Sequence, residues 1–197
     1  MFNFKLILNV LGILLIALSA LMLIPTLVDL IYLSQTWVSF LISSLICLGF
    51  GISIFLSTRG DGEESKLTTK DAFLLTTASW TVIALFGAIP FYISNLEFSL
   101  TDSIFESMSG VTTTGSTIIT DLEAMTRGLL IWRSLLQWLG GIGIIVMAIS
   151  ILPVLQVGGM QVFRTESSDT SDKILPRTAQ VASAVLTIYI SLTSLCA

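Results

Sequence analysis

Histidine is absent from this sequence of 197 residues, and cysteine occurs only twice. The lack of histidine excludes a Ser-His hydrolase and any imidazole metal site within this chain. Cys47 and Cys196 both lie inside apolar runs, so neither a disulfide framework nor a metal cluster is predicted. No Gly-rich phosphate loop of the Walker type occurs, and the lysines lie only in loops or near the ends of apolar runs. We therefore do not expect ATP hydrolysis, an intramembrane Ser or Thr hydrolase, or any other enzyme.

Charge is also scarce. Only 11% of the residues are charged and 54% are hydrophobic, whereas an average soluble domain has roughly 25% charged residues. This composition predicts an all-α, polytopic membrane protein in contact with membrane lipid. The formal net charge is -4, and no basic patch with interleaved aromatics occurs. We therefore expect no nucleic-acid partner.

Four apolar runs are long enough to cross a bilayer, whose hydrocarbon core takes about 20 helical residues. They cover residues 6–27, 37–56, 72–93 and 128–155, and a fifth run begins near Thr178. The first exceeds the 7–15 residues of a signal-peptide core, so we expect a retained helix, with cleavage near residues 17–20 as the alternative. Because the fifth run stops at Ala197, we interpret the chain as an amino-terminal fragment or as a repeat unit that needs others.

The segment between the third and fourth runs has a different pattern. Residues 102–111 predict a helix of only about 15 Å, half of the hydrocarbon core, which cannot span it. Ser99 or Thr101 can cap this helix, and Ser103 with Glu106 matches a capping box. Non-helical backbone at membrane depth must be buried in protein or line a watery cavity. The helix and the Thr/Gly loop after it, residues 112–117, therefore predict a re-entrant pore loop.

The Thr/Gly loop has the chemistry of a cation site. A dehydrated cation needs several oxygens at once, which consecutive backbone carbonyls supply. Gly115 can adopt backbone angles forbidden to other residues, and the threonine hydroxyls add ligands or support the strand. The preceding helix also directs the negative end of its dipole toward the loop. A Ser/Thr-rich extracellular turn without a ligand is the alternative.

The basic residues gather on one side of the predicted helices. That side contains Lys5, Arg59, Lys66, Lys70, Arg164, Lys173 and Arg177, and only Arg127 lies clearly on the other. The positive-inside bias therefore predicts a cytoplasmic amino terminus. The loop then enters from outside, where an acidic fringe would concentrate cations. This fringe consists of Glu97, Asp102, Asp121 and Glu123.

Four segments resemble a known family. They are FESMSGVTTTGST at 105–117, QWLGGIGI at 137–144, and ILP at 151–153 with GGMQ at 158–161. In this order they resemble the Trk/Ktr/HKT superfamily, most closely the bacterial Trk-type potassium uptake membrane subunit, and the resemblance covers nearly the whole chain. It implies potassium uptake across the bacterial cytoplasmic (inner) membrane. The pore would consist of four helix/pore-helix/helix repeats around a pseudo-fourfold axis, with one filter strand from each.

The resemblance divides the chain into a leading transmembrane helix pair (1–58), a cytoplasmic loop (59–71), the first repeat (72–155), a second cytoplasmic loop (156–177) and a truncated second repeat (178–197). Three of the four filter strands would be missing. We therefore expect no selective pore from this chain unless the missing pore repeats or further copies complete it. A subunit of a tetrameric cation channel and a non-conducting membrane scaffold are the alternatives.

The resemblance also assigns roles to residues of the loop. The carbonyls of Thr113 and Thr114 look like ligands of the potassium ion, with Thr112, Gly115 and Ser116 extending the strand. The family uses glycine at the position of Gly115 for potassium preference, whereas sodium-conducting relatives are associated with serine. The resemblance further implies a homodimer and a cytosolic nucleotide-binding regulatory subunit, docked at residues 158–159 and 164–177, where an ordinary solvated loop is an equal interpretation. Some members are symporters, and nothing in these residues demonstrates proton coupling.

Two ionisable residues are expected within or near membrane depth, where such groups are usually paired toward the protein interior. Our hypothesis is that Glu106 and Arg133 form an ion pair that braces the pore helix against the fourth run. In the alternative, Arg133 snorkels to the interface and Glu106 meets water. Gly140, Gly141 and Gly143 predict close helix packing, with a gating hinge as the alternative.

Overall fold

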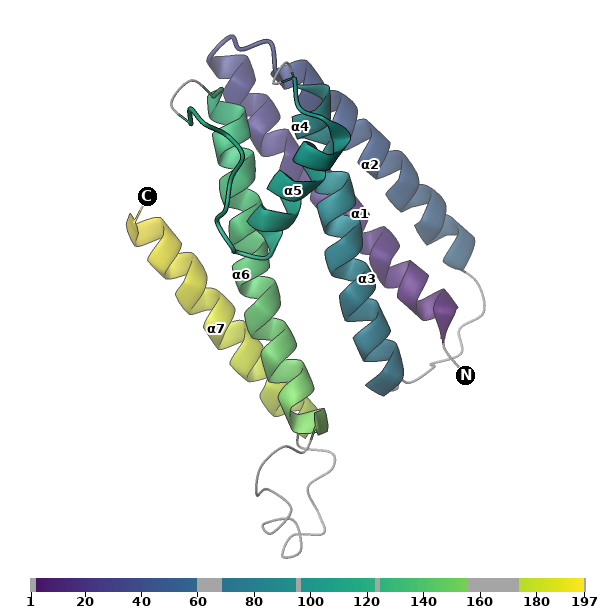
Figure 1. Ribbon diagram of the computed structural model, residues 1–197. Helices are drawn as coiled ribbons and strands as arrows, with labels where there is room; N and C mark the ends of the chain where they lie inside the picture. The colour runs from purple at the N-terminus through teal and green to yellow at the C-terminus, as the bar shows by residue number, and fades with distance from the viewer. Residues whose placement is uncertain (1–2, 60–68, 95–96, 123–124, 156–173, 197) are drawn as a thin grey trace, which may run out of the picture. The chain divides into compact units, whose positions relative to one another are not determined.

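The computed structural model describes residues 3–59, 69–94, 97–122, 125–155 and 174–196 (Figure 1). Within these ranges the chain is helical and contains no β-strand. Its helices are α1 (Phe4–Ile31), α2 (Trp37–Thr58), α3 (Thr69–Gly87), α4 (Ile89–Ile93), α5 (Leu100–Val111), α6 (Arg127–Leu155) and α7 (Ile174–Cys196). Four segments are long and apolar enough to cross a membrane: Phe4–Ile31, Trp37–Thr58, Lys70–Ile93 and Arg127–Ile145. The predicted all-α, polytopic membrane fold is confirmed.

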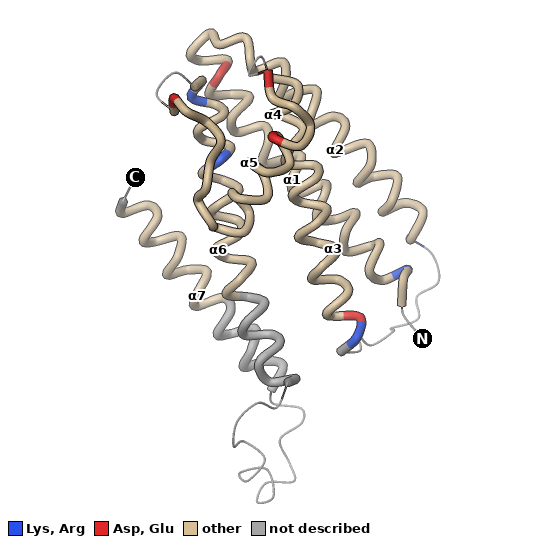
Figure 2. The backbone as a smooth tube through the Cα atoms, in the orientation of Figure 1, with Lys and Arg blue, Asp and Glu red and all other residues tan. Residues whose placement is uncertain are grey.

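The chain forms two compact units, Met1–Gly140 and Gly141–Ala197. The first unit contains α1 to α5 and the beginning of α6. The second contains the rest of α6 and α7. In the described part of the first unit, charged residues lie toward helix ends and around α5 and its loop (Figure 2).

Helices α1 and α2 form a tightly packed hairpin. A Cβ added at Gly12 would lie 3.1 Å from the carbonyl oxygen of Gly51, and one added at Gly51 would lie 3.0 Å from the backbone nitrogen of Ile16. The hydroxyl of Ser44 donates a hydrogen bond to the carbonyl of Ser19 at 2.9 Å. Small side chains thus let the two backbones approach closely and bond across the contact, as in other membrane helix pairs.

The third apolar run is not one uninterrupted helix. The sequence predicted a single run over residues 72–93, but α3 ends at Gly87 and α4 begins at Ile89. Pro90 lies in the first turn of α4 and has no N–H to continue the hydrogen-bond ladder. The indole N–H of Trp132, on α6, donates a hydrogen bond to the Gly87 carbonyl at 2.9 Å. A buried donor thus satisfies a carbonyl at this break.

The buried core of the first unit lies among α1, α2, α4 and α6. Trp132 and Phe40 are fully buried and pack edge to face, with ring centroids 6.3 Å apart. The other members are Leu15, Leu18, Met22, Cys47, Phe91, Met125, Leu129 and Leu136. This cluster holds the first part of α6 in place, and α5 lies beside α6 (Figure 1).

Candidate ion-binding loop

The short helix α5 comes before the candidate site and has a complete amino-terminal cap. Its 12 residues extend about 18 Å, well short of the roughly 30 Å hydrocarbon core. The Ser99 hydroxyl accepts a hydrogen bond from the backbone N–H of Asp102, whose carboxylate accepts one from the Ser99 N–H. The predicted capping box of Ser103 and Glu106 is therefore wrong. Ser103 donates to the Ser99 carbonyl instead, and Glu106 lies one turn further along.

The cap makes the stability of α5 dependent on pH. Hydrogen bonds from the side chain and backbone of Ser99 lower the pKa of Asp102 below its ordinary value of 3.8. The carboxylate therefore stabilises the fold above pH 3.8, and this contribution is lost as the pH falls through the lowered pKa. We expect Asp102→Asn to lower the thermal unfolding midpoint in detergent at pH 7, and the deficit to shrink toward pH 3. A deficit of equal size at both pH values, with exposed Thr101→Ala as the control, would contradict this prediction.

Past the end of α5, the chain folds back on the helix through its N–H groups. Thr112 N–H donates to the Met108 carbonyl at 2.9 Å, and Thr114 N–H donates to the Ser109 carbonyl at 3.1 Å. In the described part of the chain, four consecutive carbonyls accept no hydrogen bond: those of Thr112, Thr113, Thr114 and Gly115. Thr113, Thr114 and Gly115 are exposed in this chain, and Thr112 is partly buried. Unpaired carbonyls in series are the ligand type that a dehydrated cation requires.

Two residues of the loop have left-handed backbone conformations. Thr113 has φ +57° and Gly115 has φ +78°. A β-branched residue seldom adopts this region, which costs on the order of 1–3 kcal/mol. A Cβ added at Gly115 would meet nothing within 4 Å. Glycine is therefore favoured at residue 115 by its backbone angle and not by lack of space.

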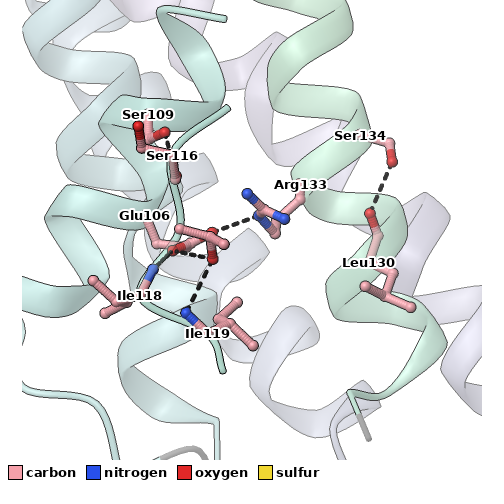
Figure 3. Close-up of polar contacts among 9 residues, drawn as sticks. Glu106, Ser109, Ser116, Ile118, Ile119, Leu130, Arg133 and Ser134 are labelled. Atoms are coloured by element: carbon pink, nitrogen blue, oxygen red, sulfur yellow. Dashed lines mark hydrogen bonds and ion pairs between the residues drawn. The ribbon is translucent and has the colours of Figure 1, made fainter. Parts of the chain in front are cut away.

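The returning strand is bonded to the side chains of α5 (Figure 3). The Ser109 hydroxyl donates to the Ser116 carbonyl at 2.5 Å, which occupies one of that carbonyl's lone pairs. The Glu106 carboxylate accepts hydrogen bonds from the Thr117 hydroxyl at 3.0 Å and from the Ile118 N–H at 3.3 Å. Both strands of the loop are thus anchored to one short helix.

Glu106 also faces the positively charged side chain of Arg133 on α6. The Nε of Arg133 lies 2.5 Å from Glu106 Oε1, and the two side chains are 12% and 0% exposed (Figure 3). Within the described ranges this Nε–H finds no acceptor in hydrogen-bonding geometry, so the contact is an ion pair. The structure therefore brings together the two residues that the sequence analysis paired.

Glycines on α5 and α6 bring the loop close to α6. A Cβ at Gly110 would lie 3.1 Å from the Cβ of Leu136. One at Gly140 would overlap the carbonyl oxygen of Val111, the last residue of α5, and lie 3.2 Å from a methyl of Thr113. Gly141 belongs to the second unit, where a Cβ would lie 2.6 Å from the Tyr189 hydroxyl. Close packing is therefore observed at Gly140 and Gly141.

Sequence reasoning missed Asp29, which lies just past the first predicted apolar run. This carboxylate is 0% exposed and accepts a hydrogen bond from the Gly128 N–H of α6 at 2.7 Å. The partners are 99 residues apart in sequence, so no local pattern predicts the contact. The one available signal was an acidic residue at the end of an apolar run. Glu123 and residues 158–161 of the predicted motifs lie outside the described residues.

Helices long and apolar enough to cross a membrane, with a half-length helix and a loop of unpaired carbonyls between two of them, define a polytopic membrane protein. Residues 39–197 match the family described as TrkH, cation transport protein. The chain belongs to this family.

Named relatives and a solved structure agree with this assignment. The Trk system potassium uptake protein TrkI of Halomonas elongata is 44% identical over 97% of this chain and 38% of its own length. TrkH of Escherichia coli K12 is 39% identical over 99% of this chain and 41% of its own length. The crystal structure of the potassium transporter TrkH from Vibrio parahaemolyticus matches with a TM-score of 0.81 and 39% identity, over 97% of this chain and 38% of that chain. The chain thus spans about two fifths of the length of these relatives.

Proposed function

We propose that this chain contributes one filter strand to a potassium uptake protein of the bacterial inner membrane. The observation that carries the proposal is the run of four unpaired carbonyls at residues 112–115, which ends at the left-handed Gly115. Potassium is the transported ion, and the carbonyls of Thr113 and Thr114 are its main ligands, with Thr112, Gly115 and Ser116 extending the site. The names of the relatives, which are potassium uptake proteins, support this choice of ion.

The rest of the pore comes from outside this chain. One loop surrounds a cation on one side only, and the exposed side of residues 113–117 is where further filter strands would close the site. With the amino terminus in the cytoplasm, the loop enters from outside. An inside-negative membrane potential then favours entry by about 2.3 kcal/mol per charge per 100 mV. The complete protein would form a homodimer and bind a cytosolic nucleotide-binding regulatory subunit. The segment predicted to dock this subunit lies largely outside the described residues.

Potassium uptake in a potassium-uptake-deficient bacterium tests the proposal. We expect the full-length protein to restore growth at low potassium, and Gly115→Ala at matched expression to lose uptake or potassium preference. A Cβ at φ +78° costs roughly 1–2 kcal/mol and displaces the carbonyls on either side. Gly115→Ser should reduce the preference for potassium over sodium. Unchanged uptake and preference in both variants would refute the filter strand and favour a non-conducting scaffold.

A further inference from the structure

One buried carboxylate joins three helix ends in the first unit. Asp29, near the end of α1, accepts hydrogen bonds from the Gly128 N–H in the first turn of α6 and, at 2.5 Å, from the hydroxyl of Thr36, the residue before α2. The Thr36 hydroxyl oxygen also lies 3.2 Å from that of Thr126, the residue before α6. The hairpin of α1 and α2 is thereby bonded to the start of α6.

The packing around Asp29 leaves little room for α6 to shift. A Cβ at Gly128 would overlap the carboxylate, so glycine is needed for this close approach. Met22, Phe40 and Leu129, from α1, α2 and α6, belong to one buried cluster. The negative charge also lies at the positive end of the α6 dipole. The start of α6 therefore has one defined position against the hairpin.

Because α6 is one continuous helix, the position of its start also sets the positions of the α6 residues that contact α5 and its loop. Arg133 and Gly140 lie about 8 Å and 18 Å along the helix axis from Gly128, at 1.5 Å per residue. Arg133 pairs with Glu106, and Gly140 lies against the Val111 carbonyl. A displacement of the start of α6 would therefore disturb both of these contacts between α6 and the segment formed by α5 and its loop.

We infer that Asp29 is a positioning residue for the cation site. It anchors α6 to the leading hairpin and so sets the distance between α6 and the pore loop. The inference rests on the proposed function, because its consequence concerns the same carbonyls. It assigns a role to the leading helix pair, which lies outside the predicted repeat and contributes no residue to the loop.

Transport by Asp29→Ala in the full-length protein is the first test. The variant removes the acceptor for both Gly128 and Thr36, and loss of a helix cap changes an equilibrium roughly two- to thirtyfold. When only a fraction of molecules has α6 in place, apparent affinity falls by that fraction. We therefore expect the KM for potassium to rise by up to about thirtyfold, and the preference for potassium over sodium to fall. Asp29→Asn keeps an acceptor for the Gly128 N–H, so it should give a smaller change in the same direction. This variant replaces Asp29→Ala in the transport test if Asp29→Ala does not accumulate in the membrane.

Thr26→Val is the matched control. Thr26 is a buried polar residue of the same helix, but its hydroxyl bonds to the Met22 carbonyl within α1. We expect this variant to keep the KM and ion preference of the unmodified protein. Equal shifts in Thr26→Val and Asp29→Ala would overturn the positioning role, as would unchanged transport in Asp29→Ala.

A cross-link distinguishes positioning from direct ion binding. Thr36→Cys with Thr126→Cys, in a background without other reactive cysteines, replaces two hydroxyl oxygens 3.2 Å apart with sulfurs that can form a disulfide of about 2.05 Å after a small adjustment. In Asp29→Ala, oxidation of this pair should restore potassium preference, and reduction should abolish it again. A completed cross-link without recovery would refute positioning and favour a direct role for Asp29.

The rate of disulfide formation reports on the anchor without any transport. We expect the Thr36→Cys/Thr126→Cys pair to oxidise several-fold faster with Asp29 present than in Asp29→Ala. If the full-length protein takes up no potassium, the proposed function fails while this rate still decides whether Asp29 holds α6. Equal rates in the two backgrounds would overturn the anchor itself.

Discussion

Replacing Arg133 with glutamine is expected to destabilise the first unit by about 3–5 kcal/mol, because it leaves a buried carboxylate without its cation. Glu106 would keep only the neutral donors from Thr117 and Ile118. A loss of this size is a large part of the roughly 5–15 kcal/mol that stabilises a typical protein. Thermal unfolding in detergent, followed by size-exclusion chromatography, measures it. The loop should be disturbed first, so potassium preference should fall even in protein that still assembles.

A double-mutant cycle identifies the interaction itself. If the two side chains are coupled, Glu106→Gln combined with Arg133→Gln should be less destabilised than the sum of the single variants, because neither charge is then left unpaired. Arg59→Gln is the control, since Arg59 lies just past the end of α2 and contacts the ring of Phe55, remote from the loop in sequence. Normal assembly and transport in Glu106→Gln, with both abolished in Arg133→Gln, would refute the pairing.

Gly140→Ala is expected to have the second large effect, and to act on ion selectivity through the backbone. The new methyl group would overlap the Val111 carbonyl oxygen, and backbone atoms cannot swing aside as a flexible side chain can. Either α6 or the end of α5 must move, which costs about 1–3 kcal/mol for an overpacked contact. Because Val111 directly precedes the unpaired carbonyls, we expect loss of potassium preference in uptake assays at matched expression.

Gly49→Ala provides the comparison for Gly140→Ala. Gly49 also lies inside a spanning helix, but a Cβ there would meet nothing within 4 Å. The same substitution should therefore leave uptake and ion preference unchanged. If Gly140→Ala also left uptake and ion preference unchanged, the close approach of α6 to the loop would not be needed for ion selectivity.

The local features of the site could be predicted from the sequence, because each depends on neighbouring residues. The short length of α5 followed from the interruption of the apolar pattern, and Ser99 was one of the two cap residues predicted. The capping box failed at Glu106 for a physical reason. A carboxylate can accept from several donors, and the tertiary structure brings the loop and Arg133 to Glu106, whereas Asp102 caps the helix.

The sequence by itself determined the class of protein, because the bilayer restricts what an apolar chain can form. Spanning runs must become helices, and a half-length helix with a Thr/Gly loop must lie inside the protein. Only the tertiary structure decided which side chains hold that loop. The Asp29 contact with Gly128 joins residues 99 positions apart, and Gly140 lies against the Val111 carbonyl. Such contacts depend on how the helices pack against one another. Helix packing depends on residues throughout the chain, so no local sequence pattern predicts these contacts.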